Sequence, residues 1–189
     1  MMDVGIKFPN KGDFANHDVI ENELNYIFSY PTERHPNRTP KPIHFYGVPY
    51  IGYPPQIDKL IAYFKLIRED QCQTIPQQIW HFHLDFPILF ASVYNEYFYF
   101  ADAIAQLFSL QYPVAYSYHT ENKTTGNRHP HFHYIVSTSS YIPDYPALDA
   151  DHLIQYLVQM PSIAERYNIN LYFQQRQEEL QCLNLTKIF

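Results

Sequence analysis

Apolar residues recur along this chain at two spacings, one typical of helices and one typical of strands. Spacings of three and four residues place apolar side chains on one face of a helix. By this criterion the sequence predicts four helices, at residues 16–30, 54–70, 94–110 and 149–167. Alternation of apolar and polar residues, together with short β-prone runs, predicts six strands, at residues 4–8, 43–53, 78–86, 112–119, 131–138 and 169–174.

The order of these elements predicts an α+β fold. The strands at 112–119 and 131–138 flank a loop that contains the turn signal Gly126-Asn127, so they are expected to form a hairpin. Strands separated by helices around a central hairpin indicate one mostly antiparallel sheet flanked by helices. The 189 residues fit a single domain with its own hydrophobic core.

The composition bears on the partners of the protein. The net charge of −6 counts against an extensive DNA-binding surface, because lysine and arginine supply most of the non-specific affinity for phosphates. A nucleic-acid function would therefore need a local site, or an accessory DNA-binding protein that supplies positive charge. The 18 tyrosines and 14 phenylalanines provide core packing and also rings that can stack on bases.

Cysteine use and hydropathy predict where the protein works. Cys72 and Cys182 lie far apart and form no CxxC motif, which favours a reduced, cytoplasmic protein. No apolar stretch approaches the roughly 18 residues that a membrane span needs, and the first residues do not resemble a signal peptide. We therefore expect no association with a membrane.

Three histidines carry the clearest chemical signal in the sequence. His131 and His133 alternate on one predicted strand, so their side chains point to the same face, about 7 Å apart along the strand. His119 ends the partner strand of the hairpin and can lie opposite this pair. Three imidazoles that converge in this way leave coordination positions open, as catalytic metal ions require. The sequence therefore predicts a divalent-metal site, although imidazole ligands alone do not identify the metal.

Other histidines allow a plainer interpretation of this region. His129 lies close by, so the cluster could also be a solvated, histidine-rich loop. His81 and His83 form a second alternating pair, but no third histidine accompanies them in the sequence. We expect His81 and His83 to be ordinary histidines of a sheet.

The segment from Tyr118 to Ser137 reads YHTENKTTGNRHPHFHYIVS and resembles the His-hydrophobic-His motif of the mobilisation relaxases. These are the HUH single-strand endonucleases of mobile elements, and the likeness is greatest to those of Gram-positive plasmids and integrative elements. Upstream, FADAIAQLFSLQYPVAYSYHTEN is similar to the helix and strand that precede this motif in the family. Near the start, ENELNYIFSYP is similar to the early helix that carries the family's nucleophilic tyrosine. The resemblance covers about residues 16–174.

The resemblance implies a chemistry and a set of roles. His119, His131 and His133 would hold a divalent ion, Mg²⁺ or Mn²⁺, and no small-molecule cofactor is implied. Tyr26 would be the nucleophile, with Tyr30 as a substitute, and would attack a phosphate of single-stranded DNA at an origin. The products would be a 5′-phosphotyrosine bond and a free 3′-hydroxyl. With 18 tyrosines in the chain, however, any single one is most often a packing residue.

Some features depart from the family pattern. The loop between the first histidine and the pair is longer, Ser137 and Thr138 follow where an asparagine is expected, and the chain is acidic. Rolling-circle replication initiators of the same superfamily place their tyrosine on a helix after the histidines. Tyr156 lies on such a predicted helix, but the lysine that accompanies it in those relatives is missing.

Few basic residues are available to contact phosphates. Arg34, Arg38 and Lys41 lie in the proline-rich segment 31–42, and Lys123 and Arg128 lie near the predicted metal site. Each of them could equally be a solvated loop charge.

Three functions from different classes therefore remain open. The first is a metal-dependent DNA-nicking enzyme that starts plasmid mobilisation or rolling-circle replication. The second is a catalytically reduced protein of the same fold that binds single-stranded DNA or a partner. The third is an unrelated metalloenzyme or metal-binding protein that uses the same three histidines.

Overall fold

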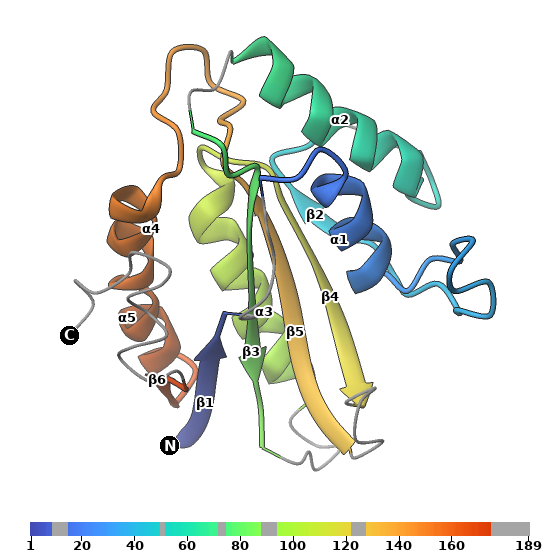
Figure 1. Ribbon diagram of the computed structural model, residues 1–189. Coiled ribbons are helices and arrows are strands. Elements are labelled where there is room, and N and C mark those ends of the chain that lie inside the picture. Colours follow the sequence, from blue (N-terminus) through green and yellow to red (C-terminus); the bar gives the residue numbers. More distant parts are fainter. Residues whose placement is uncertain (9–14, 50–51, 72–74, 88–93, 122–127, 175–189) are drawn as a thin grey trace.

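A computed structural model describes residues 1–8, 15–49, 52–71, 75–87, 94–121 and 128–174 of the chain. Within these residues, six strands and five helices follow in the order β1-α1-β2-α2-β3-α3-β4-β5-α4-α5-β6 (Figure 1). The strands are β1 (Met2–Lys7), β2 (His44–Tyr46), β3 (Ile79–Asp85), β4 (Val114–Glu121), β5 (Arg128–Ser137) and β6 (Ile169–Phe173). The helices are α1 (Val19–Ile27), α2 (Ile57–Asp70), α3 (Tyr94–Ser109), α4 (Ala150–Leu157) and α5 (Met160–Glu165).

All six strands form one sheet in the order β2-β4-β5-β3-β1-β6. Every neighbouring pair is antiparallel except β1 and β6, which run parallel. The predicted α+β class with a mostly antiparallel sheet is therefore confirmed, as is the hairpin, which β4 and β5 form. The turn signal Gly126-Asn127 lies outside the described residues.

Helices cover the two faces of the sheet differently. On one face α3, α4 and α5 pack against the larger core, whose aromatic centre includes Phe82, Phe108 and Tyr134. On the other face α1 and α2 cover a smaller apolar cluster that includes Ile79, Ala115 and Ile135 of the sheet (Figure 1). This division follows from strand alternation, because neighbouring residues of a strand point to opposite faces.

Three elements are shorter than the sequence pattern predicts. The helix expected at 149–167 is interrupted, because Pro161 lies in the first turn of α5 and has no N–H to continue the bonding of α4. The strand expected at 43–53 extends only over β2, and Gly47 follows it with a φ of 64°. The first helix ends at Ile27, since Ser29 adopts a left-handed φ of 53°.

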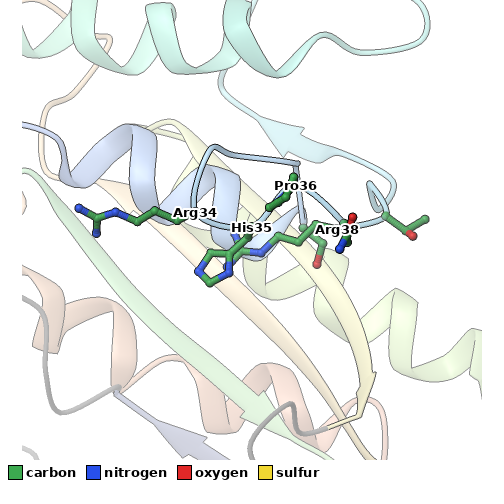
Figure 2. A pocket seen from close by; sticks show the side chains of 7 residues that line it. Arg34, His35, Pro36 and Arg38 are labelled. Carbon is green, nitrogen blue, oxygen red and sulfur yellow. The ribbon is translucent and has the colours of Figure 1, made fainter.

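The segment that follows α1 leaves the sheet and forms a basic loop, residues 31–42. An open hollow of about 560 Å³ is lined by Ser29 and by residues 34–39 of this loop. Figure 2 shows Arg34, His35 and Arg38 gathered around this hollow next to α1. The backbone N–H of Lys41 donates to the carbonyl of Phe28 at 2.8 Å, which holds the end of the loop against α1. No helix of the described segments combines the length and the apolar character that crossing a bilayer requires.

Candidate metal centre

A polar patch continues the α1 face of the sheet beyond its apolar cluster. In the antiparallel register, Ser117 of β4, His133 of β5 and His83 of β3 lie in one row across the sheet. The next row contains His119, His131 and Asp85 in the same strand order. Strand alternation places all six side chains on one face, and α1 lies beside them. The sheet therefore gathers histidines from three strands at one place.

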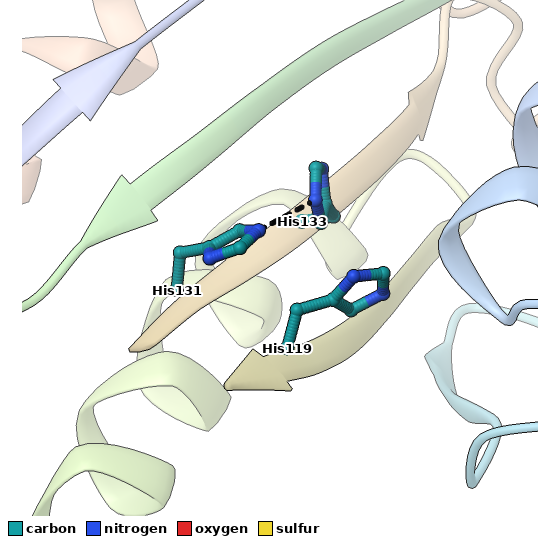
Figure 3. A group of neighbouring side chains, drawn as sticks. All are labelled: His119, His131 and His133. Atoms are coloured by element: carbon teal, nitrogen blue, oxygen red, sulfur yellow. Dashed lines mark hydrogen bonds between the residues drawn. The ribbon is translucent and has the colours of Figure 1, made fainter. Parts of the chain in front are cut away.

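Three of these histidines form a compact group. The ligand nitrogens of His119, His131 and His133 lie within 4.8 Å of one another. The three side chains are buried, with exposed fractions of 3%, 7% and 5%. In Figure 3 His131 and His133 project from β5 toward each other, and His119 projects from β4 beside them. The histidines predicted from the sequence are thus brought together, and the group could hold a metal ion.

Backbone carbonyls determine which nitrogen carries the proton in two of these rings. His119 Nε2 lies 2.6 Å from the carbonyl oxygen of Ile27, and His131 Nδ1 lies 2.6 Å from that of His129. A carbonyl only accepts, so both of these nitrogens donate and carry hydrogen. The unprotonated nitrogens are consequently Nδ1 of His119 and Nε2 of His131, and an unprotonated nitrogen is what a metal ligand needs.

Two of the three histidines, His131 and His133, have lowered pKa values. Burial is the main cause that lowers the pKa of His131 to about 4, with smaller contributions from His83 and His129, while the carbonyl of His129 and the carboxylate of Asp85 act in the opposite direction. Burial also lowers the pKa of His133 well below its ordinary value, and four neighbouring histidines act in the same direction. Metal binding requires neutral imidazole, and the lowered pKa values favour that form in His131 and His133.

A second group, formed by Asp85, His129 and His131, also satisfies the distance criterion for a metal site. Asp85 Oδ1 already accepts from His83 Nδ1 at 2.9 Å and contacts His129 Nε2 at 3.2 Å. Burial alone would raise the pKa of Asp85, but hydrogen bonding and charge from His83, with smaller contributions from His129 and His131, lower it overall. Because the two groups share His131, and its Nδ1 is occupied by a carbonyl, the three-histidine group is the better candidate.

Tyr26 of α1 lies directly beside the histidine cluster. The centre of its ring is 5.5 Å from that of His133 and 6.5 Å from that of His119. Burial raises the pKa of Tyr26, the nearby Glu23 carboxylate raises it further, and Arg38 opposes them. The guanidinium carbon of Arg38 lies 5.9 Å from the centre of the Tyr26 ring. The basic loop therefore borders the same tyrosine as the histidines do.

The other two candidate tyrosines are placed differently. Tyr156 belongs to the opposite face, where its ring stacks on Phe108 at 4.9 Å and its hydroxyl donates to Gln111 at 2.9 Å. The sheet thus separates Tyr156 from the histidines. Tyr30 packs against the cluster beneath α1 and α2. Of the remaining basic candidates, Arg128 begins β5, and Lys123 lies outside the described residues.

His81 and His83 are hydrogen-bonded histidines of β3, as expected, but their position beside the three-histidine group was not predicted. His81 Nε2 lies 2.9 Å from His133 Nδ1, and the ring centre of His83 lies 5.3 Å from that of His133. His81 Nδ1 in turn contacts Glu23 Oε2 of α1 at 2.8 Å. The signal was present as the alternation in His81-Phe-His83-Leu-Asp85, but the sequence does not reveal that β3 pairs with β5.

No family model matches this chain, and neither a curated protein nor a solved structure matches it. The resemblance to mobilisation relaxases therefore stays a prediction from the motif.

Proposed function

We propose that this protein is a metal-dependent enzyme that nicks and rejoins single-stranded DNA through Tyr26, as at the start of plasmid mobilisation or rolling-circle replication. The observation that carries the proposal is the position of Tyr26, whose ring packs at 5.5 Å against a histidine of the three-histidine group. The tyrosine that the family resemblance implies and the histidine cluster predicted on the hairpin thereby meet at one place.

The donor set fits a divalent transition-metal ion. His119, His131 and His133 would bind it, through nitrogens that lie within 4.8 Å of one another. Imidazole nitrogen suits transition ions such as Fe²⁺, Ni²⁺ and Zn²⁺, whereas Mg²⁺ and Mn²⁺ prefer oxygen ligands, so the ligands do not select between the two predicted ions and Mn²⁺ serves as the probe. When bound, such an ion would polarise the phosphate oxygens and offset their charge during the reaction.

The proposed reaction is a transesterification that the residues of this chain position. The hydroxyl oxygen of Tyr26 bonds to phosphorus as the bond from phosphorus to the 3′ oxygen breaks. The phenol loses its proton and the 3′ oxygen gains one, so no further reactant is consumed. The covalent bond to tyrosine conserves the energy needed to rejoin the strand. Arg34 and Arg38, which line the hollow beside α1, would bind neighbouring phosphates of the strand.

A second candidate is a protein that uses the same site to bind DNA but no longer nicks it. The observation in its favour is the acidic balance of the chain, with a net charge of −6. Such a protein would bind single-stranded DNA without forming a covalent bond to it.

Covalent capture of DNA tests the proposal. The protein is incubated with Mn²⁺ and a labelled pool of single-stranded oligonucleotides, and a protein-linked band is sought on a denaturing gel. We expect a metal-dependent band that disappears in Tyr26→Phe and in the double variant His131→Ala/His133→Ala. Tyr156→Phe is the matched control, because its hydroxyl lies on the other face of the sheet, and it should keep the band.

Other results of this experiment would favour the alternative nucleophile or the alternative functions. A band that survives Tyr26→Phe and disappears in Tyr30→Phe would move the nucleophile to Tyr30. Binding of the oligonucleotides without any band would favour the binding protein. Binding of Mn²⁺ with neither a band nor DNA binding would favour an unrelated metalloprotein.

A further inference from the structure

Two successive hydrogen bonds between side chains join helix α1 to His133, one of the three histidines that could hold a metal ion. Glu23 Oε2 lies 2.8 Å from His81 Nδ1, and His81 Nε2 lies 2.9 Å from His133 Nδ1. His81 and His133 are both buried, with exposed fractions of 3% and 5%. Neither Glu23 nor His81 belongs to the three-histidine group. His81 therefore contacts a candidate ligand, and Glu23 contacts His81.

The directions of these two hydrogen bonds follow from Glu23. A carboxylate only accepts, so His81 Nδ1 carries hydrogen and donates to Glu23. An uncharged imidazole has one N–H, so His81 Nε2 is an acceptor and must receive its bond from His133 Nδ1. His133 then carries its hydrogen on Nδ1, and its Nε2 is unprotonated.

This assignment leaves two unprotonated nitrogens facing each other. His133 Nε2 lies 3.0 Å from His131 Nε2, and the carbonyl of His129 has already fixed the His131 hydrogen on Nδ1. With both hydrogens placed elsewhere, no proton joins the two rings. Two lone pairs at this distance repel each other, and a cation bound by both of them relieves that repulsion.

We propose that Glu23 and His81 are positioning residues that hold His133 in the tautomer able to bind a metal ion through Nε2. The proposal rests on the metal centre of the proposed function, but not on the nicking reaction. Under this proposal α1 orients candidate metal ligands in addition to carrying Tyr26. The carbonyl of Ile27, at the end of the same helix, orients His119, so the helix that carries Tyr26 orients two of the three ligands. Acceptors of this kind behind a ligating histidine typically change metal affinity by about 10- to 100-fold.

The tautomer of His133 can be measured directly in the metal-free protein. Nitrogen-15 shifts of labelled histidine side chains distinguish Nδ1–H from Nε2–H, and the His133 signals are assigned by their loss in His133→Gln. We expect the hydrogen on Nδ1 in the wild-type chain, and a population with the hydrogen on Nε2 in Glu23→Ala. Wild-type His133 with its hydrogen on Nε2, or a tautomer that Glu23→Ala leaves unchanged, would overturn the proposal.

Calorimetric titration with Mn²⁺ alone supplies a second readout. Glu23→Ala should weaken binding by about tenfold. Glu23→Gln should recover most of that loss, because the amide oxygen can still accept from His81. The matched control is Glu21→Gln, which removes the same charge from the same helix at an exposed ion pair with Lys65, and it should bind Mn²⁺ as the wild type does. Equal affinities for the wild type and Glu23→Ala would contradict the proposal.

The two proposals fail in different ways. If no covalent DNA band forms, the nicking reaction is rejected, but the tautomer of His133 and the Mn²⁺ affinities still test the role of Glu23 and His81. Absence of Mn²⁺ binding in the wild-type protein would remove the metal centre, and the tautomer measurement would still decide whether Glu23 and His81 orient His133.

Discussion

Burial lowers the pKa of several histidines in this protein, so the free energy of unfolding is expected to fall in acid. The pKa of His131 falls from an ordinary 6.5 to about 4, first because of burial. Between these two values the unfolded chain binds a proton at this position that the folded protein does not bind. The free energy of unfolding therefore rises with pH through this window and falls as the pH is lowered.

We predict that the metal-free protein loses stability between pH 6.5 and pH 4. One pKa unit corresponds to about 1.4 kcal/mol, so His131 alone accounts for up to about 3 kcal/mol. His133 and His81, whose pKa values burial also lowers, act in the same direction. Urea unfolding at several pH values measures the effect.

Two variants serve as references for this pH dependence. His131→Asn should make the profile less steep, because one of the titrating rings is gone. The exposed His17→Gln should reproduce the wild-type profile. A wild-type unfolding free energy that stays constant over the window would show that the histidines are not buried in their neutral form.

At the scale of residues, the sequence identified some members of the candidate metal centre. The alternation of His131 and His133, and the hairpin that brings His119 opposite them, were sufficient to predict one compact group. Glu23 and His81 were not predicted, because they reach the centre through packing of α1 on the sheet and through the pairing of β3 with β5. Local spacing carries no information about either contact.

At the scale of elements, α1 depends on α2 for its position. Leu24 and Phe28, at and just beyond the end of α1, share an apolar cluster with Leu60 and Phe64 of α2, and all four side chains are fully buried. Because α1 carries Glu23 and Tyr26, this cluster also holds the residues that border the histidines.

We predict that Leu60→Ala lowers the free energy of unfolding by about 2–5 kcal/mol, since it leaves a cavity between the two helices. Leu66 lies on the same helix but is 51% exposed, so Leu66→Ala should change the stability by less than about 0.5 kcal/mol. Chemical denaturation followed by circular dichroism measures both. Equal losses in the two variants would show that Leu60 does not hold α1 in place.

Element boundaries were predicted less well than element types. The apolar periodicity of residues 149–167 continues across the break between α4 and α5, because both helices bury side chains in the same core. The missing N–H of Pro161 determines where the helix breaks. Apolar periodicity does not predict this break, because it depends on side-chain hydrophobicity and not on backbone hydrogen-bond donors.

At the scale of the whole molecule, charge limits how the protein could hold DNA under the proposed function. The chain is acidic overall, yet Arg34 and Arg38 both line the hollow beside α1 (Figure 2). Affinity for single-stranded DNA should then depend on a few local cations, and not on a broad basic surface. Each phosphate that a protein neutralises on a single strand contributes about −0.7 to the slope of log affinity against log salt.

We predict that Arg34→Gln and Arg38→Gln each reduce the magnitude of this slope by about 0.7. Fluorescence anisotropy with a labelled single-stranded oligonucleotide, repeated at several salt concentrations, gives the slopes. Arg166→Gln makes the same change of charge at the end of α5, on the opposite face of the sheet, and should leave the slope as it is. Unchanged slopes in both loop variants would mean that the hollow does not contact phosphates.

The position of β1 has a consequence for the order in which the protein can be assembled during its synthesis. This strand pairs with β3, which begins at Ile79, and with β6, which begins at Ile169. As the chain leaves the ribosome from its N-terminus, β1 therefore emerges long before either neighbour exists. The histidines of β3, β4 and β5, and the helix α1 beside them, are all complete before β6 is made. The three histidines that could hold a metal ion are thus all present while the edge of the sheet is still open.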